Sequence, residues 1–228
     1  IKTTYCKECV YPINAVNLRI DADGICSSCK VHKANLKIGK SYWKKREKQF
    51  KKILIEYKKK NKSSYDCVIP VSGGKDSYYQ THLICKRYGL KPLLVTYDGN
   101  NFLSEGIYNR DKMKNHFDAD HILWAPSVKV LRKINKLAFL KMGDMNWQNH
   151  CGIFTAPIII AEKFKIPLII WGETSWDISG MFSSSDDVEF SVRTRHEHDL
   201  RGYEWIDFSK EKKNRLSFKD FIWADYPS

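Results

Sequence analysis

The stretch V-I-P-V-S-G-G-K-D-S-Y-Y, Val68 to Tyr79, places a glycine-rich polar loop directly behind an apolar run. Glycines let backbone amides approach a ligand closely, and the helix expected after the loop adds unpaired N–H groups and a partial positive charge. Ser72 and Ser77 can donate hydroxyl hydrogen bonds, and Lys75 can offset phosphate charge. The stretch therefore predicts a phosphate-binding loop, although its spacing differs from the G-x-x-x-x-G-K-[ST] pattern of P-loop NTPases.

Asp76 is the unusual member of this loop. A carboxylate beside phosphates is repulsive unless a cation lies between them, so we interpret Asp76 as a group that directs Mg²⁺. The alternative is a plain Gly-Gly turn followed by a capping aspartate.

From Tyr65 onward, strand-like and helical patterns alternate. We expect Pro70 to mark the last rungs of the first strand and Gly89 to end the first helix. Ser104 is expected to cap a helix, and Pro157 to lie in the first turn of another. The expected strands are 65–71, 91–97, 120–124 and 166–171, and the expected helices are 77–88, 104–117, 128–141 and 155–164.

Repeated units of this kind predict an α/β fold, an open and mostly parallel sheet with helices on both faces. Ligands on such sheets bind beyond the carboxyl ends of the strands. The glycine loop, Asp98, Gly172 and Glu173 all follow expected strands, so we expect them at one edge of the sheet.

Four cysteines form a second motif near the N-terminus, Cys6-Lys-Glu-Cys9 and Cys26-Ser-Ser-Cys29. Each C-x2-C turn can direct two thiolates to one side, and two turns complete a tetrahedral shell around Zn²⁺. A closed shell has no open position for water, so the predicted zinc is structural. Two disulfides are the alternative, which fits poorly with the absence of an evident secretion signal.

Net charge is +13, from 39 Lys+Arg against 26 Asp+Glu, and much of the surplus lies between residues 37 and 62. This segment predicts a basic amphipathic helix. The preferred interpretation is a helix that packs by one apolar stripe with its lysines in water, and the alternative is an RNA- or partner-docking helix. The stripe comprises Trp43, Phe50, Ile53, Leu54 and Tyr57. No apolar run approaches the ~20 residues of a membrane span. A cytoplasmic protein without a membrane partner is therefore expected.

The expected organisation is a four-cysteine zinc knuckle at 1–36, a basic linker helix at 37–62 and the main α/β domain at 63–228.

The loop S-G-G-K-D-S resembles the signature of the PP-loop ATP pyrophosphatases, which include GMP synthetases, asparagine synthetases and tRNA thiolases. The resemblance implies an adenine nucleotide alpha hydrolase-like fold in which ATP is split between its α- and β-phosphates. The loop would hold pyrophosphate while the AMP moiety passes to a substrate oxygen. Residues implied to contact ATP or pyrophosphate are Ser72, Gly73, Gly74, Lys75, Asp76 and Ser77. Asp98 and Gly172 are expected in the same site, and the expected catalytic residues are Lys75, Asp76, Glu173 and Cys151.

Three further stretches, together with the loop, resemble the N-acetyl sugar amidotransferases of bacterial surface-polysaccharide and nonulosonic-acid pathways. They are Tyr5-Cys-Lys-Glu-Cys-Val-Tyr-Pro12, His150-Cys-Gly-Ile-Phe154 and Trp171-Gly-Glu173, and the match runs in order over nearly the whole chain. The resemblance implies that a sugar acetamido group becomes an acetamidino group. Ammonia would come from a partner glutaminase through a cyclase-like subunit. Because such proteins usually continue beyond Ser228, we expect the main domain to be C-terminally incomplete.

Roles follow from this resemblance. Glu173 is expected to bind Mg²⁺ or orient ammonia, or else to be a capping carboxylate. Cys151 is expected to line the acceptor pocket, or else to be a small buried hydrophobe; ammonia can attack the adenylate directly, so a nucleophilic cysteine is not needed. A basic cluster after the loop 183–187 is expected to bind a nucleotide-sugar diphosphate or carboxylate, or to be an ordinary charged loop. It comprises Arg193, Arg195, His196, His198 and Arg201.

The competing class is an RNA-modifying PP-loop enzyme, a thiolase or lysidine-type protein that adenylates a tRNA base. The charge of +13 suits tRNA. However, the zinc knuckle uses both C-x2-C motifs and leaves Cys151 alone, without the paired cysteine of a sulfur relay. A nucleotide-binding module without turnover would give Lys75 and Asp76 no role. We therefore expect a sugar, not a nucleic acid, as the partner.

Overall fold

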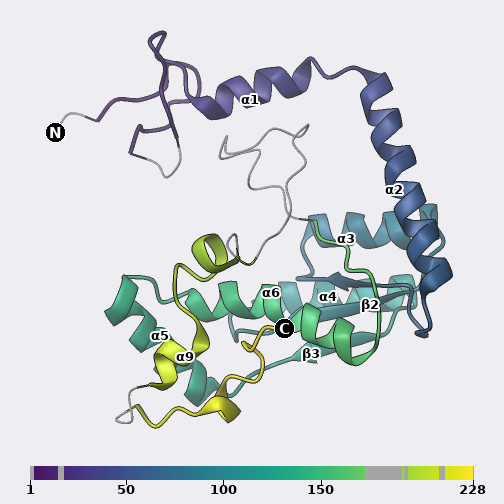
Figure 1. Cartoon of the computed structure of the whole chain (residues 1–228), viewed down its shortest axis with the longest axis vertical. Coiled ribbons are helices and arrows are strands. Elements are labelled where there is room, and N and C mark those ends of the chain that lie inside the picture. Colours follow the sequence, from purple (N-terminus) through teal and green to yellow (C-terminus); the bar gives the residue numbers. More distant parts are fainter. Residues whose placement is uncertain (1–2, 15–17, 173–191, 193–194, 211–213, 228) are drawn as a thin grey trace. The chain divides into compact units, whose positions relative to one another are not determined.

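The computed structural model describes residues 3–14, 18–172, 192, 195–210 and 214–227 of the chain (Figure 1). The chain divides into two compact units, one built on residues 1–53 and the other on residues 54–172 and 190–228. The division falls within a single helix, α2 (Lys40–Lys60). Each unit is described below by itself.

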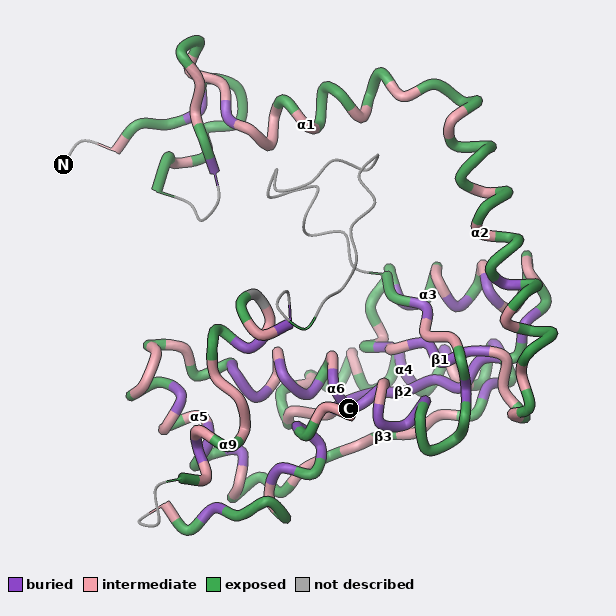
Figure 2. The backbone as a smooth tube through the Cα atoms, in the orientation of Figure 1, coloured by how far each residue is buried: buried purple, intermediate pink, exposed green. Residues whose placement is uncertain are grey.

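The N-terminal unit is folded around its cysteines. Antiparallel bridges join Tyr5 to Pro12 and Ile20 to Cys26, and helix α1 (Ser27–Leu36) follows. The buried hydrophobic residues of this cluster are Cys6, Leu18 and Cys26, and Figure 2 shows the rest of the unit largely intermediate or exposed. So small a core supplies little stability of its own, which is the usual situation of domains that require a metal.

Helix α2 forms from the basic segment, as the sequence predicts, and the i,i+4 pairs Glu47–Lys51 and Glu56–Lys60 support it. Its expected apolar stripe is only partly covered. Leu54 is buried, whereas Trp43 and Ile53 are 47% and 44% exposed. The helix therefore depends on local propensity and charge pairs more than on a buried stripe.

The second unit contains a parallel sheet of β1 (Cys67–Pro70), β2 (Pro92–Tyr97) and β3 (His121–Trp124), in the order β1-β2-β3. The fourth expected strand, 166–171, is reduced to one parallel bridge between Ile169 and Val68, on the other side of β1. The strand that carries the glycine loop thus has neighbours on both sides. The expected fold class, an α/β chain with a parallel sheet and an N-terminal four-cysteine cluster, is confirmed.

Helices connect these strands: α3 (Lys75–His82), continued by the π-helical turn η1 (Leu83–Arg87), then α4 (Ser104–Phe117), α5 (Val128–Met142) and α6 (Trp147–Lys163). Gly89, with φ +62°, follows the first of them at the predicted stop. Helix α3 begins at Lys75 and not at Ser77, so the lysine and aspartate of the loop belong to its first turn.

The cap of α4 and the start of α6 also differ from the prediction. Leu103 is the N-cap of α4, and the Ser104 hydroxyl donates to Glu105 instead of capping the helix. Helix α6 begins at Trp147, which places Pro157 well inside it and puts the whole H-C-G-I-F stretch on the helix. Glycine and proline in a helix interior both oppose the helical pattern, and tertiary packing overrides them here.

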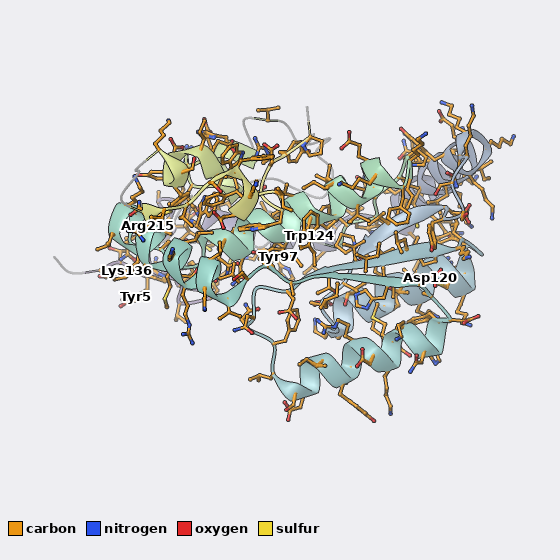
Figure 3. All side chains as sticks on the ribbon, turned by 90° about the horizontal axis from the view of Figure 1, so that it is seen from below. Tyr5, Tyr97, Asp120, Trp124, Lys136 and Arg215 are labelled. Atoms are coloured by element: carbon orange, nitrogen blue, oxygen red, sulfur yellow. The ribbon has the colours of Figure 1, made fainter. Side chains whose placement is uncertain are left out.

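Alternating residues of β2 face opposite layers. Leu93 and Val95 share a buried cluster with Ile160 of α6, and Tyr97 packs with Cys151 of the same helix. Thr96 points to the other face, where it contacts His121. Figure 3 shows α6 on one face of the sheet and α4 on the other, with Tyr97 and Trp124 at one end of the strands and Asp120 at the opposite end.

The C-terminal segment completes the larger core. It contains η2 (Arg195–Asp199), α9 (Trp205–Ser209) and η4 (Phe218–Asp220). Trp147 of α6 packs on Phe208 with ring centroids 4.4 Å apart, and Trp223 packs on Tyr97 at 5.1 Å. Among the described residues, no helix is both long and apolar enough to cross a membrane.

Candidate functional site

The glycine loop lies at the carboxyl end of β1 and leads directly into α3. Gly73 has φ +81°, and Gly74 is the N-cap of α3 without a side-chain cap. The Ser72 hydroxyl accepts a hydrogen bond from the Gly74 N–H at 3.3 Å. The first-turn amides of α3 therefore face the loop without a capping side chain, which is the arrangement that binds phosphate groups at helix N-termini.

The polar side chains of the loop divide into two groups. Lys75 and Asp76 are 87% and 76% exposed, and their ammonium and carboxylate lie 2.8 Å apart. An ion pair this exposed contributes little to stability, so both groups are free to turn to a ligand. Ser77 is buried instead, with its hydroxyl donating to the Gly74 carbonyl and its carbonyl accepting from Thr81. Ser77 thus holds the loop in shape.

The sheet register brings the other expected residues to the same edge. Val71 donates to the Val95 carbonyl, and continuing this pairing puts Gly73 level with Asp98. On the other side of β1, a Cβ on Gly172 would lie 2.8 Å from Oε1 of Gln80, a residue of α3. The loop, Asp98 and Gly172 are therefore gathered at the carboxyl edge of the sheet, as the sequence predicts for ligand-binding residues.

Arg110 of α4 is a site residue that the sequence did not reveal. It is 6% exposed, and its Nη1 lies 3.7 Å from Oδ2 of Asp98. A Cβ on Gly73 would lie 2.7 Å from the Gly106 carbonyl oxygen and 3.0 Å from the Arg110 nitrogen, so α4 touches the loop. The one signal available is its spacing with Met113 and Phe117, which places it on the buried stripe of the helix.

Two hydrogen bonds join the three strands at the residue before the loop. The Thr96 hydroxyl donates to the Val71 carbonyl at 2.6 Å and contacts Nε2 of His121 at 2.9 Å. Because the hydroxyl proton is already used, Nε2 of His121 must be the donor. Burial, reinforced by the positive charges of Arg110 and Lys114, lowers the pKa of His121 to about 4. The imidazole is therefore neutral at physiological pH, and it ties β3 to the residue before the loop.

The start of α6 approaches the same edge. A Cβ on Gly99 would lie 1.9 Å from Oδ1 of Asn149, so the polar run before H-C-G-I-F touches the turn after β2. Phe154 of that stretch and Trp171 of W-G-E have ring centroids 5.1 Å apart. The H-C-G-I-F stretch and Trp171 are thus neighbours in the fold.

Cys151 lies in the core and not on an open surface. It is fully buried, 3.8 Å from the Thr155 hydroxyl and 3.8 Å from the Ala224 carbonyl. Burial raises the pKa of its thiol to about 12, so the thiolate is strongly disfavoured. Gly152 explains the close packing, because a Cβ there would lie 2.3 Å from the Tyr97 ring. These positions agree with the interpretation of Cys151 as a small buried hydrophobe.

Three residues of the basic cluster near residue 200 contact acidic side chains of the same chain. Arg195 donates to both carboxylate oxygens of Glu204, at 3.2 and 2.8 Å, and its guanidinium lies 4.5 Å from the Tyr226 ring centroid. His196 contacts the same carboxylate at 3.2 Å. Arg201 faces Asp144 at 4.0 Å. Arg195, one of the five basic residues expected to bind a nucleotide-sugar diphosphate or carboxylate, is therefore paired within the chain.

Three expected site residues lie outside what the structure describes. Glu173 and Arg193 fall in segments beyond the described residues, as does the loop 183–187, and the side chain of His198 is not described either. Their roles remain predictions.

The four cysteines converge in the N-terminal unit, with sulfur atoms all within 4.8 Å of one another. Cys6 and Cys29 sulfurs lie 3.9 Å apart, and those of Cys9 and Cys26 lie 3.6 Å apart. A tetrahedral shell with Zn–S bonds of about 2.3 Å has edges of about 3.8 Å, whereas a disulfide requires about 2.05 Å. Backbone N–H groups of Glu8, Cys26 and Cys29 also donate to these sulfurs. The cluster can therefore hold a zinc ion.

No family model matches the chain. An uncharacterized protein of Methanocaldococcus jannaschii, MJ1599, is 32% identical over 78 residues, which are 34% of this chain and 28% of that protein. The chain thus aligns with little more than a quarter of that relative's length.

Two solved structures overlap the chain partially. NMN synthetase from Francisella tularensis covers 79% of this chain and 75% of its own, with 13% identity and a TM-score of 0.41. A predicted subunit of tRNA methyltransferase from Methanocaldococcus jannaschii covers 64% of this chain and 72% of its own, with 14% identity and a TM-score of 0.33. Overlaps of this size assign no activity to the chain.

Proposed function

We propose that this chain is an ATP-dependent, AMP-forming enzyme of the PP-loop class, and that its acceptor is the acetamido oxygen of an N-acetyl sugar, free or nucleotide-linked. The observation that carries the first part is the loop itself. A left-handed Gly73, an uncapped α3 N-terminus and the exposed pair Lys75 and Asp76 meet at the carboxyl end of β1. These features suit a polyphosphate held by backbone amides and one ammonium group.

The proposed reaction has two steps. The amide oxygen of the sugar attacks the α-phosphorus of ATP, the bond to the bridging oxygen breaks, and pyrophosphate leaves. Ammonia then adds to the activated amide carbon, and AMP leaves with the former amide oxygen. The sugar gains NH in place of oxygen, so the acetamido group becomes an acetamidino group. Adenylation is needed because an amide oxygen is otherwise a very poor leaving group.

The chain's residues have defined parts in this scheme. The α3 amides and Lys75 bind the departing pyrophosphate, and the Thr96 and His121 chain keeps the loop in position. Asp76 is the residue that would hold Mg²⁺, which supplies charge neutralisation between phosphate oxygens when it is bound. Cys151 takes no covalent part, because its thiol is buried in the core.

The proposed acceptor and partners depend on the resemblance of H-C-G-I-F and W-G-E to the sugar amidotransferases. Phe154 of H-C-G-I-F packs on Trp171, and Asn149, just before H-C-G-I-F, reaches the turn after β2 at Gly99. This supports a shared substrate region next to the nucleotide. In the proposed pathway, a partner glutaminase supplies ammonia through a cyclase-like subunit in the cytoplasm.

The experiment is to incubate the chain with ATP, Mg²⁺, ammonium and UDP-linked diacetamido sugars. We expect AMP and pyrophosphate in equal amounts and a sugar product lighter by about one mass unit, as follows from replacing O by NH. Gly73→Ala serves as the loop-defective control. AMP formation that requires tRNA and does not depend on the sugars would favour the tRNA-modifying alternative. The net charge of +13 is the observation that suits this alternative.

A further inference from the structure

Arg110 occupies a position that its burial alone does not explain. It lies on α4, which returns from the carboxyl edge of the sheet after β2. Side chains in a helix lean toward its N-terminus, so a long side chain at this place reaches back to that edge. The 3.7 Å separation between its Nη1 and the Asp98 carboxylate agrees with this direction.

The guanidinium is buried and incompletely paired. Nη1 is inaccessible to solvent, and among the described residues it has no hydrogen-bond partner. Asp98 is too distant for a hydrogen bond, and its Oδ1 already accepts from the Asn100 N–H at 2.8 Å. The Phe102 ring, with its centroid 4.9 Å away, supplies a cation–π contact and no acceptor. Buried arginines are almost always paired, so a donor in this state indicates a missing partner.

The position of Arg110 also places it against the phosphate-binding loop. The Gly73 backbone touches the turn of α4 that contains Gly106 and Arg110, and no side chain larger than glycine's fits between them. Burial, with the charge of Arg110 adding to it, lowers the pKa of His121 on β3, so this imidazole is neutral and does not compete as a cation. The turn of α4 that packs against the loop therefore carries a planar cation, which can offer two parallel N–H groups to one ligand.

We propose that Arg110 is a second cationic ligand of the nucleotide, binding the departing pyrophosphate from beneath the loop while Lys75 binds it from the solvent side. Asp98 holds the guanidinium in place before the ligand arrives and shares it afterwards. The inference rests on the proposed function and adds a residue that no sequence motif contains. Pyrophosphate carries more charge than AMP, so the contribution of Arg110 is expected mainly in the affinity for pyrophosphate and ATP.

The test uses the full chain and titrates inorganic pyrophosphate, ATP and AMP with Mg²⁺ by calorimetry. Arg110→Gln removes the charge and keeps a donor toward Asp98; we expect it to weaken pyrophosphate and ATP binding at least tenfold and AMP binding less than twofold. Arg110→Lys keeps the charge but lacks the two parallel N–H groups of a guanidinium. We expect its affinity for pyrophosphate and ATP to fall about threefold to tenfold. Lys112→Met removes an exposed charge from the same helix and is the matched control, with no expected change.

Circular dichroism and thermal melting establish which variants fold. If Arg110→Gln does not fold, Arg110→Lys decides the question by itself. Pyrophosphate affinity within twofold of the wild type in a folded Arg110 variant overturns the assignment of Arg110 and leaves the proposed function standing. A wild-type chain that binds neither pyrophosphate nor ATP overturns the proposed function instead, so the two failures are distinguishable.

Discussion

Gly73 holds a backbone conformation, φ +81°, that L-residues with a side chain adopt at a cost of roughly 1–2 kcal/mol. It also lies too close to α4 for a Cβ, because the Gly106 carbonyl oxygen would be 2.7 Å away. Both constraints act at the residue that shapes the loop. Neither belongs to Gly74, which has φ −80° and only the Ser72 hydroxyl within 3.3 Å of a Cβ.

Gly73→Ala is therefore expected to destabilise the chain by about 2–4 kcal/mol, the sum of a strained φ and an overpacked contact. ATP binding should fall with it, because α4 and the loop must separate. Urea unfolding and ATP titration measure the two effects. Gly89→Ala is the matched control, since Gly89 has φ +62° but nothing within 4 Å of a Cβ. Equal losses of stability in the two variants would show that the contact with α4 has no energetic role.

His121 gives the loop a pH dependence with a definite sign. An unfolded histidine has a pKa of about 6.5, whereas burial and the charges of Arg110 and Lys114 lower the pKa of His121 to about 4, with Asp111 opposing them. Between these values the unfolded chain binds a proton that the folded chain does not. Stability from His121 is therefore complete above pH 6.5 and is lost as the pH falls toward 4.

We expect the urea midpoint to fall between pH 7.5 and pH 4.5, and to fall less in His121→Asn, which keeps a donor toward Thr96 and does not titrate. Parallel midpoint curves for wild type and variant would contradict this assignment. The variant should be slightly less stable at pH 7.5, because the shorter asparagine side chain makes a weaker contact with Thr96 than His121 does at 2.9 Å.

At the scale of elements, the contact between α6 and β2 depends on one glycine. Gly152 is an interior residue of α6, where glycine costs about 1 kcal/mol relative to alanine, yet a Cβ there would lie 2.3 Å from the Tyr97 ring. The Tyr97 hydroxyl donates to Oε1 of buried Gln148 at 2.7 Å, so the ring cannot move without breaking a buried hydrogen bond. Packing thus outweighs helix propensity at this position.

Gly152→Ala should consequently lower the free energy of unfolding by about 2–3 kcal/mol, despite the gain in propensity. Gly106→Ala in α4 is the comparison, since its Cβ would meet only the Phe102 ring at 3.4 Å. That change is expected to be neutral or slightly stabilising. Chemical denaturation of both variants tests the contrast, and a stabilised Gly152→Ala chain would refute it.

The elements also show what can be predicted from sequence. β1 and β2 are continuous apolar runs next to turn residues, so their existence and the position of the loop and Asp98 follow from local pattern. The start of α6 was missed because Gly152 and Pro157 oppose a helix locally, and only the packing on Tyr97 supports one. Arg110 was missed for another reason. Its role is inferred from its closeness to Gly73 and Asp98, and these residues come near Arg110 only in the folded chain.

At the scale of the whole molecule, the two units have very different cores. The second unit buries Trp147, Phe208, Phe221 and Trp223, whereas the N-terminal cluster buries Cys6, Leu18 and Cys26. Zinc binding in such small units supplies folding free energy directly. The N-terminal unit should therefore depend on metal and the second unit should not.

We expect about one zinc per chain and near-complete loss in Cys26→Ser, with residues before α2 becoming sensitive to protease while the second unit melts unchanged. Cys85→Ser, outside the cluster, is the control and should retain the metal. Metal analysis and limited proteolysis provide the measurements. A Cys26→Ser chain that keeps its zinc, or a second unit that unfolds together with the first, would count against this separation.

The bridge between Val68 and Ile169 has a consequence for how the molecule folds. The strand that leads into the loop acquires one neighbour from β2, close in sequence, and the other only from a segment far along the chain. Closing such a long loop is slow, because its entropy is lost before the pairing compensates. During synthesis, β1 remains an apolar open edge until Ile169 emerges. We therefore expect the loop region to be completed late, after a stage in which this edge can aggregate.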